Sequence, residues 1–188
     1  MKQQVPNKGR QKRISKFLSY VLRHHPESIG IKLDKAGWTD VSGLLEAAER
    51  GGFPISLDEL KAVVRENDKQ RFSLSEDCTK IRANQGHTIP VDLGYKPTIP
   101  PKVLYHGTAQ KNLNSIRKTG LTRGSRHHVH LCADPEAAEK VGRRYGKPIV
   151  LEIEAGKMYA DGHKFYLSPN GVWLTEFVPP HYLSLHKE

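Results

Sequence analysis

The stretch RFSLSEDCTKIRA, residues 71–83, contains two short runs in which polar and apolar residues alternate around a polar turn. This alternation is typical of a β-hairpin with one face against a core. Phe72 and Leu74 share one parity and are expected to face the core, so Arg71 and Ser73 are expected to point outward. The fold to which this hairpin belongs depends on the elements predicted before it.

Three helices are predicted before the hairpin from apolar residues at helical spacing, over residues 14–25, 41–50 and 56–67. Pro26 ends the first helix, and Thr39 or Asp40 caps the second. In the third helix Ser56 and Glu59 form a capping box. Three helices followed by a hairpin is the order of a winged helix. That fold binds nucleic acid in many proteins and is a plain interaction module in others.

The pattern changes after a linker rich in proline and glycine, between Asn84 and Lys102. Strands and helices are then predicted in mixture. The strands are KVLYHGT (102–108), HVHLC (128–132), PIVLEIE (148–154), KFYLS (164–168) and VWLTEFV (172–178). The helices are residues 109–120, closed by glycine, and residues 134–146, which begin with an Asp cap and a proline.

The predicted fold class is therefore α+β. We expect three parts along the chain: a basic flexible tail over 1–13, a helical lobe with a hairpin over 14–94, and a strand-rich lobe over 95–188.

The charge balance points to an anionic partner. Lys and Arg number 30 against 20 Asp and Glu, which gives a net charge of +10. Such a surplus suits a polyanion, nucleic acid first, because each neutralised phosphate releases counterions. The alternative is a soluble protein that merely has a basic face.

Other classes are disfavoured by the sequence. No segment approaches the roughly 18 apolar residues of a membrane span, and the N-terminus lacks the apolar region of a secretory signal. Cys78 and Cys132 form neither a disulfide framework nor a paired metal-ligand spacing. We expect a reduced, cytoplasmic protein with no membrane partner.

Basic residues gather at two predicted helix ends. Arg23, His24 and His25 stand before Pro26, where they either cap the helix dipole or hold an anion. GRRYGK, residues 142–147, is a second basic helix end with the same two interpretations. Neither a P-loop nor a G-x-G-x-x-G motif after a strand is present, so no Walker or Rossmann nucleotide site is predicted.

Histidines mark the strands of the second lobe. His128 and His130 alternate with apolar residues and are expected to share one face of a strand, lining a cleft. A zinc site is not expected, because no convincing further ligands or supporting carboxylates lie nearby. His106 also lies on a strand, and Gly107 after it permits close backbone approach.

Six motifs in order resemble the RNA 2′-phosphotransferase family: ISKFLSYVLRHHPESIGIKLDKAGW, KQRFSLSEDCTKIRANQGH, LYHGT, HVHL, GKPIVLEI and NGVWLT. The likeness runs from about Ser15 to Tyr182. It implies an N-terminal winged-helix RNA lobe followed by a C-terminal ADP-ribosyltransferase-like lobe, which binds NAD without a Rossmann motif and needs no metal.

The resemblance also implies a reaction and its residues. An internal 2′-phosphate of RNA attacks NAD, nicotinamide leaves, and the phosphate is then released as ADP-ribose 1″,2″-cyclic phosphate. The family's Arg-His-Arg-Arg set carries over to Arg23, His24, Arg71 and Arg144, with Arg143 as the adjacent alternative to the last. The NAD contacts carry over to His106, Gly107, Thr108, Arg126, His128 and His130.

One departure from the resemblance is Cys132, where a serine is expected after HVHL. Two other functions remain open at this stage. The first is transfer of ADP-ribose to a terminal phosphate of a nucleic acid, which stops after the first step. The second is a non-catalytic winged-helix protein that binds nucleic acid. A monomer is expected.

Overall fold

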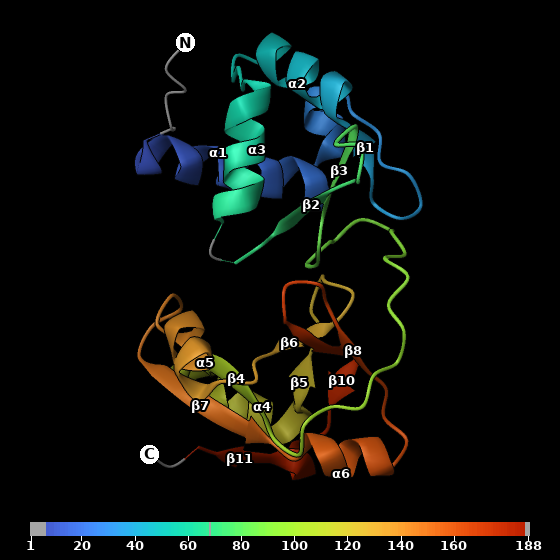
Figure 1. The fold of residues 1–188 in the computed structure, drawn as a ribbon. Helices are drawn as coiled ribbons and strands as arrows, with labels where there is room; N and C mark the ends of the chain where they lie inside the picture. The colour runs from blue at the N-terminus through green and yellow to red at the C-terminus, as the bar shows by residue number, and fades with distance from the viewer. Residues whose placement is uncertain (1–6, 68, 187–188) are drawn as a thin grey trace. The chain divides into compact units, whose positions relative to one another are not determined.

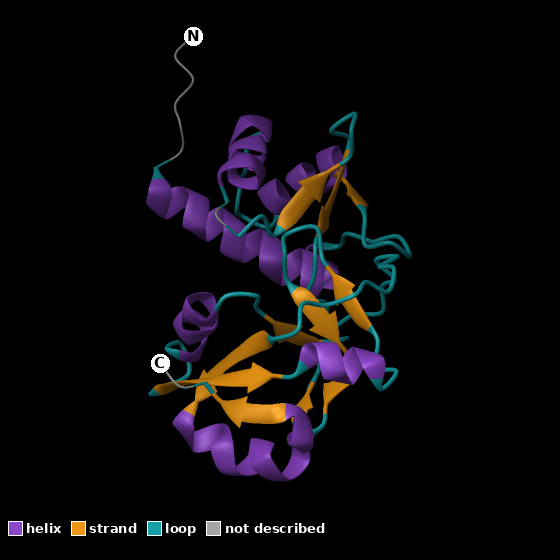
Figure 2. Ribbon diagram, turned by 60° about the horizontal axis from the view of Figure 1, so that its bottom comes forward, coloured by secondary structure: helices purple, strands orange, loops and turns teal. Residues whose placement is uncertain are grey.

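The structure is a computed structural model that describes residues 7–67 and 69–186. The chain forms two compact units, the first ending at Gly94 and the second beginning at Tyr95. Figure 1 shows that the first unit is mainly helical and the second rich in strands. Helices and strands occur in both units (Figure 2), which confirms the mixed class predicted from the sequence.

The first helix differs from its prediction at both ends. Helix α1 spans Lys8–Arg23, and the Asn7 side chain accepts a hydrogen bond from the Gly9 amide at its start. The flexible tail predicted over 1–13 is thus wrong for residues 8–13, while residues 1–6 lie outside the described part. The early turns are fixed by α3, Leu57–Glu66, because Arg10 Nε donates to Glu59 Oε1 at 3.0 Å. Tertiary contacts of this kind are not visible in local sequence.

The rest of the first unit follows the predicted order. After a short 3₁₀ turn, η1 (Pro26–Ile29), come α2 (Val41–Arg50), α3, and strands β2 (Phe72–Leu74) and β3 (Lys80–Ala83). Asp40 caps α2, and the capping box at the start of α3 is confirmed. A two-residue strand that was not predicted, β1 (Thr39–Asp40), pairs with β3, so the sheet order is β1-β3-β2.

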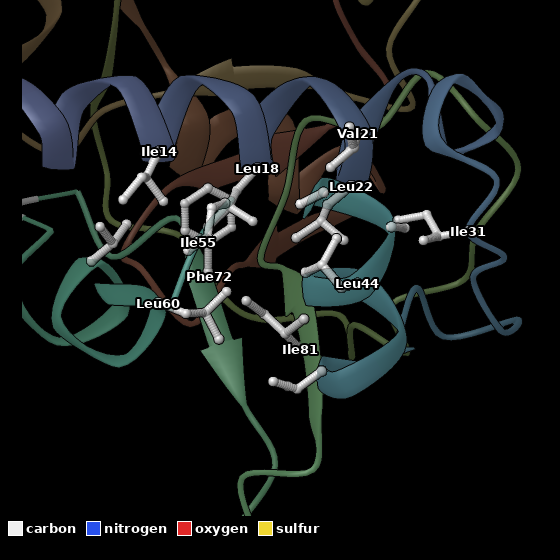
Figure 3. Packing of buried hydrophobic residues seen from close by; sticks show 14 of the residues in the cluster. Ile14, Leu18, Val21, Leu22, Ile31, Leu44, Ile55, Leu60, Phe72 and Ile81 are labelled. Atoms are coloured by element: carbon white, nitrogen blue, oxygen red, sulfur yellow. The ribbon is translucent and has the colours of Figure 1, made fainter. Parts of the chain in front are cut away.

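Helix α1 has one face in the core of this unit. Its buried residues occur every three or four positions and contact α2, α3 and the hairpin (Figure 3). The labelled members of this core are Ile14, Leu18, Val21, Leu22, Ile31, Leu44, Ile55, Leu60, Phe72 and Ile81. The polar side chains of α1 are consequently directed away from the core.

The predicted linker over 84–102 is ordered, and each half packs on its own unit. In the first half the Thr88 amide donates to the Arg23 carbonyl at 3.0 Å, and the Asp92 amide donates to the Lys35 carbonyl at 2.7 Å. In the second half the Thr98 amide donates to a carbonyl of the second unit, at 2.8 Å. Proline and glycine content predicted the absence of regular structure here, and it carried no information on these contacts.

The second unit contains two three-stranded antiparallel sheets and a two-stranded pair. One sheet has the order β11-β7-β4, from Leu183–Leu185, Pro148–Ile153 and Leu104–Ala109. The other has the order β6-β9-β8, from Val129–Leu131, Trp173–Thr175 and Phe165–Leu167. The pair joins β10 (Phe177–Val178) to β5 (Leu121–Thr122).

The helices of the second unit differ from the prediction in the length of one helix and in the presence of another. A 3₁₀ turn, η2 (Gln110–Asn112), precedes α4 (Leu113–Thr119), which Gly120 closes with φ 76°. Helix α5 covers Pro135–Gly142, so the helix predicted to reach residue 146 ends earlier. Helix α6 (Ala155–Ala160) was not predicted, and a 3₁₀ turn, η3 (Pro180–Tyr182), precedes β11. No described helix is long and apolar enough to cross a bilayer.

Two glycines bring α5 against β4, backbone to backbone. A Cβ on Gly107 would lie 1.6 Å from the Ala138 carbonyl oxygen, and one on Gly142 would lie 2.7 Å from the Thr108 carbonyl oxygen. Neither position can accept a side chain unless the helix moves off the strand. The predicted role of Gly107 in close backbone approach is confirmed, with a helix as the approaching group.

Candidate functional site

A groove of about 830 Å³ lies on the polar face of α1 in the first unit. Its other wall is formed by the C-terminal end of α3 and the segment that leads into β2. Two of the predicted phosphate residues, His24 and Arg71, line this groove together, although 47 positions (71 − 24) separate them in sequence. The fold therefore brings these two side chains to one surface.

The His24 ring follows the last residue of α1 and is held by a hydroxyl group. Its Nδ1 lies 3.0 Å from Thr88 Oγ1. The Thr88 amide in turn donates to the Arg23 carbonyl, so Thr88 is anchored by its backbone to the same helix end. The half-buried ring is thereby oriented through Nδ1.

The Arg71 side chain is oriented by an amide. Its Nη1 donates to Asn67 Oδ1 at 3.1 Å, and Asn67 Nδ2 donates to Ser15 Oγ of α1 at 3.0 Å. Asn67 therefore connects the guanidinium to the helix that forms the opposite wall of the groove. Arg71 and Ser73 are partly exposed whereas Phe72 is buried, which confirms the predicted facing of the first hairpin run.

Arg23 is partly buried beside the hairpin. Its guanidinium carbon lies 6.0 Å from the centre of the Phe72 ring, and Nη1 would lie 3.6 Å from a Cβ on Gly86. Gly86 has φ 86°, a backbone conformation that favours glycine. A Cβ there would make only an ordinary van der Waals contact with Arg23, so the preference for glycine comes from the backbone conformation.

In the second unit, His106 on β4 meets the strand that carries His130. His106 Nδ1 lies 3.0 Å from the His130 carbonyl oxygen. Because a carbonyl only accepts, Nδ1 carries the proton and Nε2 is left as an acceptor in the neutral ring. Burial lowers the pKa of His106 below its usual value, and the positive charge of Arg126 lowers the pKa further.

The remaining residues predicted to contact NAD lie in different surroundings. Thr108 is buried, and its hydroxyl accepts a hydrogen bond from Asn112 Nδ2 at 3.1 Å. Along β6, Val129 is buried while His128 and His130 are partly exposed, which confirms the predicted alternation. Arg126 is exposed in the loop before this strand.

His128 lines a second cavity of about 500 Å³. Its ring lies 5.4 Å from that of Tyr166, and burial lowers the pKa of His128. Arg123 and Lys164 line the same cavity, so it combines an aromatic wall with positive charge.

Cys132 lies where β6 meets β4, and its backbone exchanges two hydrogen bonds of 2.8 Å with Tyr105.

The two arginines after α5 differ in their contacts. Arg143 Nη2 donates to Glu139 Oε1 at 2.8 Å, and Arg143 Nε donates to the same oxygen at 3.2 Å. Arg144 is exposed, and no hydrogen bond from its side chain to a described residue is present. The ion pair ties Arg143 to its own helix.

Thr88 and Asn67 were missed by the sequence reasoning, although both orient predicted site residues. Neither belongs to a recognisable local pattern, because Thr88 lies in an irregular segment and Asn67 follows a helix. Gly142 was also passed over as a packing residue. A glycine inside a predicted helix was a usable signal there, since glycine is unfavourable in helices unless something approaches closely.

Comparison with known proteins gives a consistent result over most of the chain. Residues 9–177 match the family described as RNA 2′-phosphotransferase, Tpt1/KptA family. A protein of Agrobacterium fabrum named "Probable RNA 2′-phosphotransferase" is 56% identical over 171 residues, covering 91% of this chain and 92% of that protein. A protein of the same name from Trichormus variabilis is 52% identical, covering 94% and 97% of the two chains. Another from Flavobacterium johnsoniae is 54% identical, with the same coverage.

Proposed function

The chain belongs to the RNA 2′-phosphotransferase, Tpt1/KptA family, and from this premise we propose that it uses NAD to remove an internal 2′-phosphate from RNA, such as that of a tRNA splice junction. In the first step a phosphate oxygen attacks C1″ of the NAD ribose and the bond to nicotinamide breaks. In the second, the ribose 2″-hydroxyl attacks the phosphorus and the bond to the RNA 2′-oxygen breaks. The 2″-hydroxyl loses a proton, the RNA 2′-oxygen gains one, and ADP-ribose 1″,2″-cyclic phosphate is released.

The two units are assigned different parts of this reaction. The first is proposed to be a winged-helix lobe that holds RNA, which is supported by its three helices followed by a hairpin. The second is proposed to be an ADP-ribosyltransferase-like lobe that holds NAD, which is supported by its antiparallel sheets and by the lack of a Rossmann motif. RNA and NAD both occur in the cytoplasm, where we propose the enzyme acts.

The phosphate is proposed to be held by Arg23, His24, Arg71 and Arg144. A phosphate dianion is already a nucleophile, so the first step requires positioning more than a strong base. In the second step negative charge grows on the phosphoryl group, where the planar forks of arginine stabilise it. Arg144 is preferred to Arg143 because the latter is tied to Glu139.

His24 is proposed to handle the proton of the second step. Its partner, the Thr88 hydroxyl, both donates and accepts hydrogen bonds, so it supports either protonation state of the ring. Such a partner can keep the ring in place while its charge changes.

The NAD contacts are proposed to be His106, Gly107, Thr108, Arg126, His128 and His130. The neutral His106 ring presents an acceptor at Nε2, which suits a ribose hydroxyl. Arg126 adds a positive charge suited to a pyrophosphate. These groups fit a dinucleotide that has hydroxyl donors and anionic oxygens.

The observation that carries the proposal is the shared groove of His24 and Arg71, each held by its own side-chain partner. The test is incubation with NAD and an oligonucleotide that bears one internal 2′-phosphate. Release of nicotinamide, 2′-hydroxyl RNA and the cyclic phosphate in equal amounts is expected. ADP-ribosylated RNA as the end product would instead indicate transfer that stops after the first step, and no turnover of NAD would overturn the proposal.

A further inference from the structure

Apart from Arg23 at its end, the cations of α1 fall into two groups with different surroundings. Arg10 is paired with Glu59, donates to the Pro54 carbonyl and lies 5.1 Å from the centre of the Phe53 ring. Arg13 lies 5.7 Å from the same ring. These two arginines are therefore part of the packing between α1 and its neighbours.

The lysines of α1 form the second group, at positions 8, 12 and 16. Lys8, Lys12 and Lys16 are exposed and line the same groove as His24 and Arg71. None of the three makes an ion pair with a described residue. Their spacing of four residues places them in one row along the helix, about 6 Å apart in axial rise.

The row opposes the stability of its own helix. Like charges four residues apart repel each other on a helix surface. The row also occupies the N-terminal half of α1, where the helix dipole favours acidic residues, and α1 contains none. Two independent effects thus make these lysines unfavourable in the free protein, and an anionic ligand would relieve both.

The opposite wall of the groove adds charge of the same sign and little to offset it. Lys69 and Arg71 line it together with one carboxylate, Glu66. Glu66 accepts hydrogen bonds from Gln11 at 2.6 Å and from Arg65 at 2.9 Å, so its charge is partly compensated. The groove is therefore cationic along its length, and most strongly on the side of α1.

We propose that the RNA strand beyond the 2′-phosphate runs along α1, with its backbone phosphates on Lys16, Lys12 and Lys8 in that order. This inference rests on the proposed function, which puts the 2′-phosphate at His24 and Arg71. The helix rises about 24 Å from Lys8 to His24, a length that accommodates several nucleotides. Exposed Tyr20, between the row and His24, offers a ring on which a base can stack.

The test compares two double variants of equal charge change. Lys12→Gln with Lys16→Gln removes two of the three lysines in the row, and glutamine keeps the helix propensity of lysine. Lys32→Gln with Lys35→Gln removes two exposed lysines of the same unit that do not line the groove. Helicity measured by circular dichroism is expected to be unchanged in both.

The first measurement is binding without NAD. RNAs of about twelve nucleotides carry a 2′-phosphate near the 5′ or the 3′ end, and their affinity is followed by fluorescence anisotropy over a range of salt. The row variant is expected to bind one of the two RNAs roughly tenfold more weakly at low salt. The slope of log affinity against log salt concentration is expected to be reduced by about 1.4, or about 0.7 per lost phosphate contact. Equal effects of the two double variants on both RNAs would overturn the inference.

The second measurement separates the inference from the proposed function. A 2′-phosphorylated dinucleotide is too short to reach the row, so its turnover with NAD is expected to be equal in wild type and row variant. Turnover of the dinucleotide with no advantage for the longer RNA would overturn the path along α1 and leave the proposed function intact. If no substrate is turned over, the proposed function fails, and the binding measurement still decides the path.

Discussion

His24 in the first unit and His106 in the second both have a hydrogen-bond partner at Nδ1, but the partners are of different kinds. His24 faces the Thr88 hydroxyl, which can donate or accept, at 3.0 Å. His106 faces a backbone carbonyl, which can only accept, also at 3.0 Å. The hydroxyl is compatible with either protonation state of the first ring. In the second ring burial favours the neutral form, and the carbonyl only fixes which nitrogen carries the proton. The two contacts fit the roles proposed above, proton transfer by His24 and recognition of NAD by a neutral His106.

The residues around the two histidines differ as well. The groove that His24 lines also contains the lysines of α1 and Arg71, and Arg71 is oriented by its hydrogen bond to Asn67. Around His106 lie strands whose approach is fixed by the backbone, with Gly107 directly against α5. Loss of a charged group should therefore be most costly in the first unit, and loss of a neutral contact most informative in the second.

The largest effect is expected for Arg71→Lys, which keeps the charge. If Arg71 holds the 2′-phosphate through two parallel N–H groups, lysine makes at most a point contact. The loss is expected to be about 2–4 kcal/mol in the second step, or roughly 30- to 1,000-fold in rate. ADP-ribosylated RNA should then accumulate, visible as a slower band in quenched time points on a gel.

The matched control is Arg82→Lys, on the other strand of the hairpin. Arg82 lies 4.5 Å from the centre of the Trp38 ring and does not line the groove. Its variant is expected to keep near wild-type rates. A wild-type rate for the Arg71 variant, with no slower band, would mean that the side chain merely attracts RNA.

A smaller effect is expected for His106→Ala. Removal of one neutral hydrogen bond acceptor from a partly buried site costs on the order of 1–2 kcal/mol, so NAD should bind about tenfold more weakly. RNA binding should be unchanged, because the cationic groove lies in the first unit. Calorimetry with NAD and anisotropy with RNA measure the two affinities.

The control is His186→Ala, a histidine of the same unit that is paired with Glu152. Equal loss of both affinities in the His106 variant would contradict the division of roles between the two units.

Thr88→Val removes the partner of His24 and keeps the side-chain shape. The loss of one positioning hydrogen bond is expected to cost about 1 kcal/mol, or roughly fivefold in kcat, with little change in KM for NAD. Thr88→Ser retains the hydroxyl and should restore most of the rate. A valine variant as fast as the serine variant would show that the hydroxyl does not prepare His24.

Local sequence predicted those features of the fold that depend on near neighbours. The capping box at Ser56 and the alternation around Val129 each involve residues within a few positions, and both were predicted correctly. The start of α1 was not, because it depends on Arg10 reaching Glu59, 49 positions away. Helix α5 ends before its predicted limit at a glycine that packs on β4, again a long-range contact.

The candidate site shows the same difference between local and long-range features. The charged residues were named from the resemblance to the family, and the structure brings His24 and Arg71 to one groove. The residues that orient them, Thr88 and Asn67, lie outside regular elements and belong to no local pattern. Side chains that touch a ligand leave a signal in residue type and spacing, whereas those that position them depend on the tertiary fold.

The smallest expected effect is the pH dependence of NAD binding, and it tests the difference between the two histidines directly. The pKa of His106 is lowered by burial and by Arg126, so the unfolded chain binds its proton at a higher pH than the folded chain does. The contribution of His106 to the free energy of unfolding is therefore fully present above the unfolded pKa of about 6.5. It is lost as the pH falls through the folded pKa.

NAD affinity should therefore stay constant from about pH 8 to 6.5 and decline only at lower pH, where protonation removes the acceptor at Nε2. His128 has a lowered pKa as well, so the decline alone does not identify the group. His106→Gln keeps a polar side chain that does not titrate, and its weaker NAD binding should lose the part of the decline that belongs to His106. Calorimetry of both proteins across this range measures the difference. An affinity that already changes around pH 7 in the wild type, and not in the variant, would mean that His106 titrates like an exposed histidine and that its site is not built for a neutral ring.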